Sequence, residues 1–222
     1  MKRKSLSWKS KIKSILSPFE DMLMPKLVPK VPFWINTRPL TMMTILWCFL
    51  VILFSYLAKD NLLWLWLVSL VIIFHYITDY LDGNIGRLRN EGFVKWGYYM
   101  DHLLDYFFLC SILIGYYFIV PPNYHTLFLF IIVFACGYMV SSFIAYAVND
   151  NFRYAYFGIG PIEFQLSFII INSLIISFGK SFLALCLPYF LAVFVLGFIC
   201  VVYITQKDLF KEDMENKNSK KK

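Results

Sequence analysis

Charged residues are scarce in this sequence. Only 16% of its 222 residues are Asp, Glu, Lys or Arg, whereas 59% are hydrophobic and 20% are aromatic. A soluble domain carries about a quarter of its residues as charged side chains, so this composition excludes a soluble protein built around one buried core. It predicts an integral membrane protein instead, with no nucleic acid among its partners.

Cysteine is also scarce, and its spacing is not that of a reactive site. All five cysteines fall inside apolar runs, and none forms the C-x-x-C pair typical of metal or redox sites. They are interpreted as small core residues, which excludes a disulfide framework and a thiolate metal site. No cleavable signal peptide is predicted, because the N-terminal residues stay charged and polar for too long before the first apolar run.

Long apolar runs are abundant. Each of six runs is near the ~20 residues that a helix needs to cross a bilayer, and they cover residues 39–58, 61–81, 97–120, 124–147, 162–179 and 181–205. The sequence therefore predicts an all-α integral membrane protein with six transmembrane helices in a domain spanning residues 39–206.

The two ends of the chain are basic. In residues 1–38, apolar side chains from Trp8 to Leu27 recur at near-helical spacing, which predicts an amphipathic helix lying on the membrane interface. A disordered basic arm is the alternative. Residues 207–222 form a basic tail, which is predicted to be cytoplasmic.

The distribution of Lys and Arg predicts the orientation. Nineteen of the 21 lie in segments that would share one side of the membrane, and only Lys59 and Lys180 would lie on the other. Because cytoplasmic loops carry the excess of Lys and Arg, both termini are predicted to be cytoplasmic. The loop that follows the second apolar run is predicted to lie on the same side.

Four aspartates flank that loop. Asp79 and Asp82 are three residues apart at the end of one apolar run, and Asp101 and Asp105 are four apart at the start of the next. Either spacing places a pair on one helix face. A carboxylate at membrane depth costs about 2.5–3.5 kcal/mol on insertion scales, so four together require a compensating cation. Hard divalent cations prefer oxygen ligands, which makes a metal site the leading interpretation.

The residues around the aspartates suit a phosphate ligand. Asp79 and Asp82 are expected near a helix C-terminus, where the helix dipole disfavours anions, so helix capping does not explain them. Gly83 and Gly86 are expected just beyond that end, where a missing side chain allows a ligand close to the backbone. Arg87 offers a planar fork of donors for phosphate oxygens.

The complete pattern is Asp79-x2-Asp82-Gly83-x2-Gly86-Arg87-x9-Gly97-x3-Asp101-x3-Asp105. It resembles the signature of the CDP-alcohol phosphotransferase family, D-x2-D-G-x2-A-R-x8-9-G-x3-D-x3-D, with Gly86 in place of the alanine. The segment from Asn36 to Thr41, which opens the first apolar run, also resembles the family.

The resemblance implies an enzyme of phospholipid synthesis. Such an enzyme lets an alcohol attack the phosphorus of a CDP-alcohol, releases CMP, and uses two divalent ions, Mg²⁺ or Mn²⁺. A homodimer in the lipid bilayer is also implied. Residue by residue, the resemblance makes Asp79, Asp82 and Asp101 metal ligands, makes Asp105 a ligand or the general base, and places Asn36, Gly83, Gly86, Arg87 and Gly97 at the CDP site.

Two further residues favour one branch of the family. The motif Asp101-His102-x-x-Asp105 and the segment Gly160-Pro161-Ile162-Glu163 resemble the choline/ethanolamine phosphotransferases, in which diacylglycerol is the acceptor. His102 would then be the general base, with Glu163 setting its tautomer. The alternatives are a hydrogen-bonded interfacial histidine and, for Glu163, an acid placed in a first helical turn by the helix dipole.

Other functions and roles stay open at this point. One is a CDP-diacylglycerol-dependent enzyme that uses a small polar alcohol such as serine, inositol, inositol phosphate or glycerol 3-phosphate. Another is a cation transporter, which the apolar spans beyond Asp105 disfavour. His75, on the face of Asp79, is interpreted as a buried histidine satisfied by a backbone carbonyl, with a place behind the metal ligands as the alternative.

Overall fold

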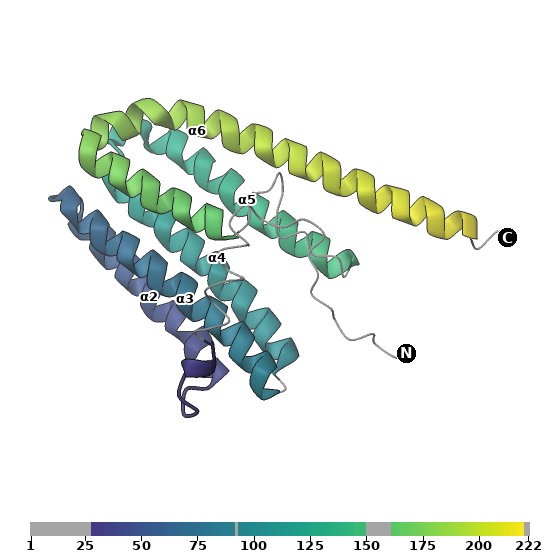
Figure 1. Cartoon of the computed structure of the whole chain (residues 1–222). Coiled ribbons are helices and arrows are strands. Elements are labelled where there is room, and N and C mark those ends of the chain that lie inside the picture. Colours follow the sequence, from purple (N-terminus) through teal and green to yellow (C-terminus); the bar gives the residue numbers. More distant parts are fainter. Residues whose placement is uncertain (1–27, 92, 150–160, 220–222) are drawn as a thin grey trace.

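The computed structural model describes residues 28–91, 93–149 and 161–219, which form helices and no strand. Along the described residues the long helices are α2 (Thr37–Leu57), α3 (Leu65–Arg89), α4 (Val94–Ile119), α5 (His125–Asn149) and α6 (Pro161–Ser219), which are labelled in Figure 1. Short 3-10 turns precede three of them: η1 (Val28–Lys30), η2 (Leu62–Trp64) and η3 (Pro122–Tyr124).

Five helices in the described residues are long and apolar enough to cross a membrane. This finding supports the predicted all-α integral membrane fold. The amphipathic helix predicted before residue 28 lies outside the described residues. The orientation of the chain and the count of six spans stay predictions.

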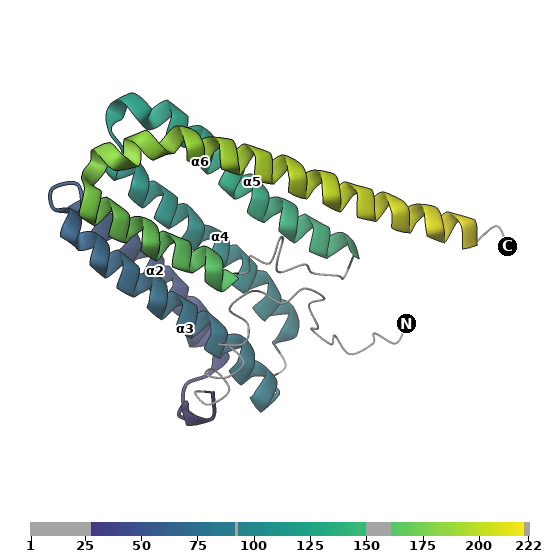
Figure 2. The ribbon, with the colours of Figure 1, turned by 45° about the horizontal axis from the view of Figure 1, so that its top comes forward.

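Six membrane spans were predicted, but five candidate helices are found in the described residues, and this difference arises in α6. This helix is 59 residues long, but Gly179 lies within it at φ 81° and ψ 179°. Only glycine adopts such a conformation readily, because it has no Cβ. Figures 1 and 2 show that α6 turns back on itself there. The two runs predicted at 162–179 and 181–205 lie on its two arms, and the second arm continues to Ser219 through most of the basic tail.

The end of α3 was predicted wrongly. The helix continues through the whole glycine-containing motif to Arg89, and Asn90 ends it in the left-handed conformation at φ 53° and ψ 45°. Asparagine is one of the few residues that tolerate this conformation at a helix C-terminus. Gly83 and Gly86 are therefore helical residues. The helix dipole acts only within the last turn, so it does not bear on Asp79, ten residues before the end.

Helix α2 is the element that holds α3 and α4 together. It packs along both of them, whereas α3 and α4 have few close backbone approaches to one another in the described residues. The Trp47 indole of α2 donates a hydrogen bond to Thr78 Oγ1 of α3 at 3.1 Å. On the α4 side, Gly115 faces Ser55, and a Cβ at this glycine would collide with the serine side chain.

A buried polar cluster fastens the middle of the bundle. The Tyr116 hydroxyl of α4 donates to Asn172 Oδ1 of α6 at 2.8 Å, and Asn172 Nδ2 donates to Ser69 Oγ of α3 at 3.0 Å. All three residues are buried, and Asn172 has no exposed surface. Such a satisfied network fixes one arrangement of the helices, because each polar group would be costly to bury alone.

Candidate active site

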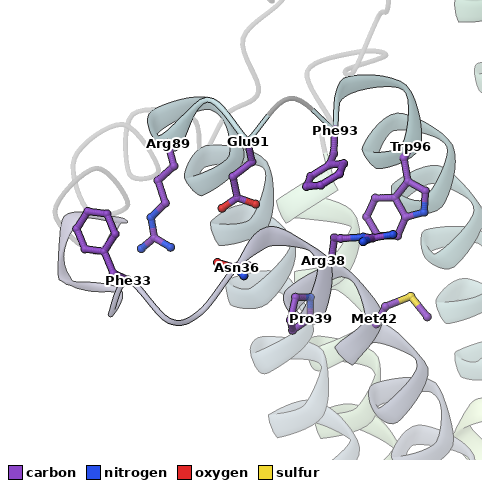
Figure 3. Close-up of a pocket in the computed structure, with 9 residues that line it drawn as sticks. All are labelled: Phe33, Asn36, Arg38, Pro39, Met42, Arg89, Glu91, Phe93 and Trp96. Atoms are coloured by element: carbon purple, nitrogen blue, oxygen red, sulfur yellow. The ribbon is translucent and has the colours of Figure 1, made fainter.

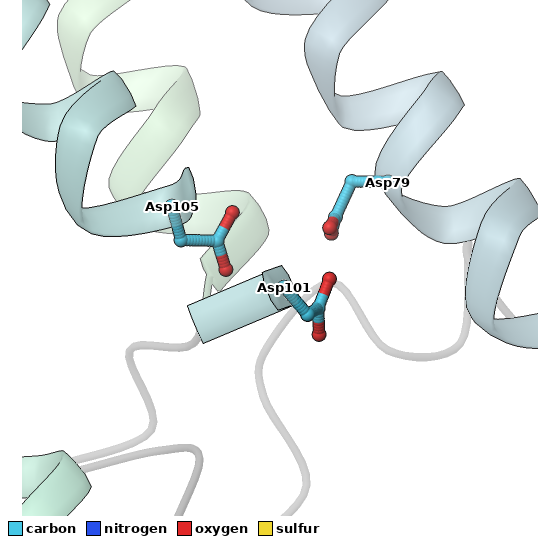
Figure 4. Close-up of side chains that lie close together, drawn as sticks. All are labelled: Asp79, Asp101 and Asp105. Atoms are coloured by element: carbon cyan, nitrogen blue, oxygen red, sulfur yellow. The ribbon is translucent and has the colours of Figure 1, made fainter. Parts of the chain in front are cut away.

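Three carboxylates converge between α3 and α4. Asp79 comes from α3, and Asp101 and Asp105 come from successive turns of α4. One oxygen of each lies within 4.8 Å of the others, and all three residues are half-buried. Figure 4 shows the three side chains pointing toward one another across the gap between the helices. The i,i+4 spacing of the α4 pair produces this arrangement, since both side chains leave the same helix face.

The fourth predicted ligand, Asp82, is not one of the three. It lies one turn further along α3, where it is only 6% exposed. Its carboxylate lies against the Thr41 side chain of α2, and the charges of Asp101 and Arg87 act on it. Sequence reasoning included Thr41 in the segment that resembles the family but gave it no role; Thr41 lies four residues after Thr37 on the buried face of α2.

His75 lies directly behind Asp105. Its ring stacks on Phe108 at a centroid distance of 3.6 Å and is 1% exposed. The Gln165 amide of α6 donates to Nδ1 at 3.3 Å, so Nε2 carries the ring proton, and it points at Asp105 Oδ1 from 3.7 Å. Its ring therefore contacts Gln165 and Asp105, and the backbone-carbonyl interpretation is wrong.

His102 lies on the other side of the carboxylates. Its Nδ1 is 2.9 Å from the Tyr98 carbonyl oxygen and 3.9 Å from Asp101 Oδ2. A carbonyl can only accept, so Nδ1 carries the proton and Nε2 carries the lone pair. The Tyr98 carbonyl thus takes the tautomer-setting place predicted for Glu163, which lies half-buried in the first turn of α6.

The glycines of the motif differ in their surroundings. Added Cβ atoms would meet nothing within 4 Å at Gly97, and at Gly83 only the Arg87 side chain at 3.5 Å, so packing does not require glycine at either position. At Gly86 a Cβ would lie 3.1 Å from Thr37 Oγ1. Gly86 therefore provides room for α2, and the ligand-facing role predicted for it has no support in this geometry.

The remaining predicted residues lie toward the helix ends. Arg87 is exposed, and its Nη2 donates to Asn84 Oδ1 at 3.2 Å. Asn36 stands just before α2 and lines a separate cavity whose lining includes none of the four aspartates. Sequence reasoning also missed Glu91, whose Oε2 accepts from the backbone N–H of Thr37 at 3.2 Å and so fixes the start of α2.

The donor set fits a divalent cation. Three carboxylates that meet within 4.8 Å repel one another strongly, and carboxylate oxygens are the ligands that Mg²⁺ and Mn²⁺ prefer. Next to them, His75 Nε2 is buried and has no hydrogen-bond partner among the described residues. If a cation were bound at the carboxylates, this N–H would lie behind Asp105, where groups that orient metal ligands are usually found.

Comparison with known protein families identifies a matching family model. The family model for CDP-alcohol phosphatidyltransferase matches residues 36–204, which is most of the chain and includes every carboxylate described above. No curated protein matches the sequence significantly.

Proposed function

Since the chain belongs to the CDP-alcohol phosphatidyltransferase family, we propose that it transfers a substituted phosphate from a CDP-alcohol to a lipid hydroxyl and releases CMP. The proposed donor is CDP-choline or CDP-ethanolamine, and the proposed acceptor is diacylglycerol. The observation that carries the proposal is the convergence of Asp79, Asp101 and Asp105 between two membrane-spanning helices.

In this proposal Asp79, Asp101 and Asp105, together with Asp82, hold two divalent ions, Mg²⁺ or Mn²⁺. When bound, these ions neutralise the pyrophosphate of the CDP-alcohol and stabilise the charge on the departing CMP. His75 lies behind the Asp105 carboxylate, with its Nε2 3.7 Å from Oδ1. Because phosphoryl transfer depends mainly on positioning and charge neutralisation, a rigid carboxylate set supplies much of what the reaction needs.

The CDP group is proposed to lie against the faces of α3 and α4 where the glycines leave space. Gly83 and Gly97 offer backbone without a side chain, and packing between helices does not account for either of them. Arg87, one turn after Gly83, directs its guanidinium toward the phosphates, where its planar fork matches two oxygens at once.

The acceptor hydroxyl is proposed to lose its proton to His102. A lipid hydroxyl is a poor nucleophile until a base removes its proton, and the Nε2 lone pair of His102 is set for this task by the hydrogen bond from Nδ1 to Tyr98. Asp101 Oδ2, 3.9 Å from the ring, would stabilise the imidazolium that forms.

An activity assay tests the transfer and its substrates. With Mg²⁺ or Mn²⁺, purified protein is expected to release CMP from CDP-choline or CDP-ethanolamine when diacylglycerol is present, and to release none after removal of divalent metal with a chelator. If the protein instead turns over CDP-diacylglycerol with serine, inositol phosphate or glycerol 3-phosphate, the family membership stands but the proposed substrates are wrong. Metal-independent turnover would contradict the carboxylate site itself.

The site is proposed to face the cytoplasm, together with both termini. The Lys and Arg bias supports this orientation, because Arg87 and Arg89 lie at the end of α3 and Lys95 lies at the start of α4. In intact cells, a cysteine replacing Asn90 should escape a membrane-impermeant thiol reagent, whereas one replacing Asn123, at the opposite end of α4, should react. The reverse labelling pattern would invert the proposed topology.

A further inference from the structure

An open cavity, most of whose lining residues are exposed, lies at the start of α2, away from the carboxylates. Its volume is about 870 Å³, and it lies where the start of α2 meets the α3–α4 connection. Figure 3 shows the polar side chains of Asn36, Arg38 and Glu91 among aromatic ones. The cavity begins where α2 enters its membrane-spanning segment at Thr37, which places it at the level of the lipid headgroups.

Arg38 is the cation available in this cavity. Its guanidinium carbon lies 5.1 Å from the centre of the Phe93 ring and 5.2 Å from that of Trp96. No carboxylate lies within ion-pair distance of it among the described residues. The two aromatic rings hold the guanidinium in place and leave its N–H groups for an acceptor, as is common where arginine binds phosphate.

Arg89, the other arginine of the cavity, is already engaged. It donates to the carbonyl oxygens of Ile35 at 2.6 Å, Val31 at 2.9 Å and Pro32 at 3.2 Å, and its guanidinium lies over the Phe33 ring. These bonds fasten the segment before α2 to the end of α3. Arg89 thus forms part of the cavity wall, and Arg38 is the arginine that can bind a ligand.

Glu91 adds an acceptor to the same cavity. Its Oε2 is used by the backbone N–H of Thr37, but its Oε1 is buried and has no hydrogen-bond partner among the described residues. A buried carboxylate oxygen without a partner is costly, so a ligand that supplies a hydrogen-bond donor would be favoured. The same negative charge repels a phosphate with two charges more than one with a single charge.

An apolar stripe runs down α2 from Arg38. Exposed side chains recur three or four residues apart, which places them on one helix face. The stripe consists of Met42, Ile45, Leu46, Phe49, Leu53 and Tyr56, each 41–60% exposed except Leu53 at 37%. A ligand with its polar part at Arg38 and an acyl chain along this stripe would match both surfaces.

We propose that this cavity binds the headgroup of a membrane phospholipid, with its phosphodiester on Arg38, an ammonium or hydroxyl donor on Glu91 Oε1, and an acyl chain along the α2 stripe. This lipid is separate from the reacting one, since none of the four aspartates lines the cavity. A phosphodiester carries one negative charge, which suits a cavity that pairs one available arginine with one carboxylate.

Lipid retention tests this site. The full-length protein, delipidated in detergent, is titrated with dioleoyl phosphatidylethanolamine and analysed by native mass spectrometry. Arg38→Gln should weaken the tightest-bound lipid by about tenfold or more, the loss expected for a charge-assisted hydrogen bond. Arg38→Lys, which keeps the charge, should lose less. The matched control is Lys59→Gln, because Lys59 also lies over an aromatic ring, Tyr56, at the opposite end of α2.

Three results would overturn the proposal. The first is equal lipid retention by wild type and Arg38→Gln with both proteins folded. The second is displacement of the lipid by millimolar inorganic phosphate, which would make the cavity a general anion site. The third is retention of phosphatidylcholine as tight as that of phosphatidylethanolamine, because a quaternary ammonium has no N–H for Glu91.

Discussion

Asp101→Asn is expected to reduce CMP release by about 10²–10³-fold or more, the loss typical when one preorganised charge-stabilising group is removed from an active site. The substitution keeps the size of the side chain but removes the charge that would hold the metal. One carboxylate oxygen of Asp101 lies within 4.8 Å of an oxygen of Asp79 and of Asp105. Removing the Asp101 charge therefore affects the shared site as a whole. The measurement is metal-dependent CMP release by protein that elutes from gel filtration like wild type.

Three further variants sharpen this test. Asp60→Asn, an exposed aspartate beyond the other end of α2, should leave turnover unchanged. His75→Phe keeps the stacking on Phe108 but loses the N–H that faces Asp105, and it should weaken Mn²⁺ binding by about 10–100-fold, as for other residues behind metal ligands.

Asp82→Asn tests the residue that lies outside the group of three. More than about a tenth of wild-type turnover in both Asp101→Asn and Asp82→Asn would contradict the two-metal proposal.

His102→Ala is expected to lower turnover by about 10²–10⁴-fold, the usual contribution of a general base. If the base acts only on the acceptor hydroxyl, binding of the CDP-alcohol should change little, so kcat should fall while the Kd for the nucleotide stays near that of wild type. Single-turnover kinetics with saturating CDP-ethanolamine and diacylglycerol separate the two effects.

His125→Ala is the matched control for His102. The His125 ring also lies at hydrogen-bond distance from a backbone carbonyl, that of Val120 at 3.0 Å. His125 begins α5, beyond the end of α4, whereas His102 lies near the start of α4. It should not affect turnover. Near-wild-type turnover in His102→Ala would remove the proposed base and with it the assignment to diacylglycerol, while the family membership would stand.

The sequence indicated which carboxylates share a helix face, because their spacing is a local property. An i,i+4 pair on a helix must share a face, and the apolar runs made the helices of α3 and α4 certain. The approach of Asp79 to Asp101 depends in addition on α2, which packs along both helices. The separation of Asp82 from this group could not be read from the spacing, because it depends on how α2 packs and brings Thr41 against that carboxylate.

The errors have specific physical reasons. Two glycines and several polar residues suggested that α3 ends near Asp82, but tertiary packing overrides glycine's low helix propensity, and the contact of Gly86 with Thr37 shows where that packing lies. The partners of His75 were hidden because Gln165 lies 90 residues later in the chain. The Arg38 cavity was also beyond sequence reasoning, since its aromatic walls come from the α3–α4 connection and the start of α4.

The position of α2 between α3 and α4 would affect which size of divalent ion the proposed site prefers. Mg²⁺ binds oxygen at about 2.0–2.1 Å and Ca²⁺ at about 2.3–2.6 Å, so a few tenths of an ångström in ligand spacing decide which ion is held well. Asp79 and Asp101 belong to helices that both rest on α2, which supplies no carboxylate of its own. Contacts that fix α2 against α3, such as the hydrogen bond from Trp47 to Thr78, would therefore influence the spacing of the proposed ligands. Selection for activity with a larger ion would be expected to collect substitutions along α2, far from the proposed metal ligands.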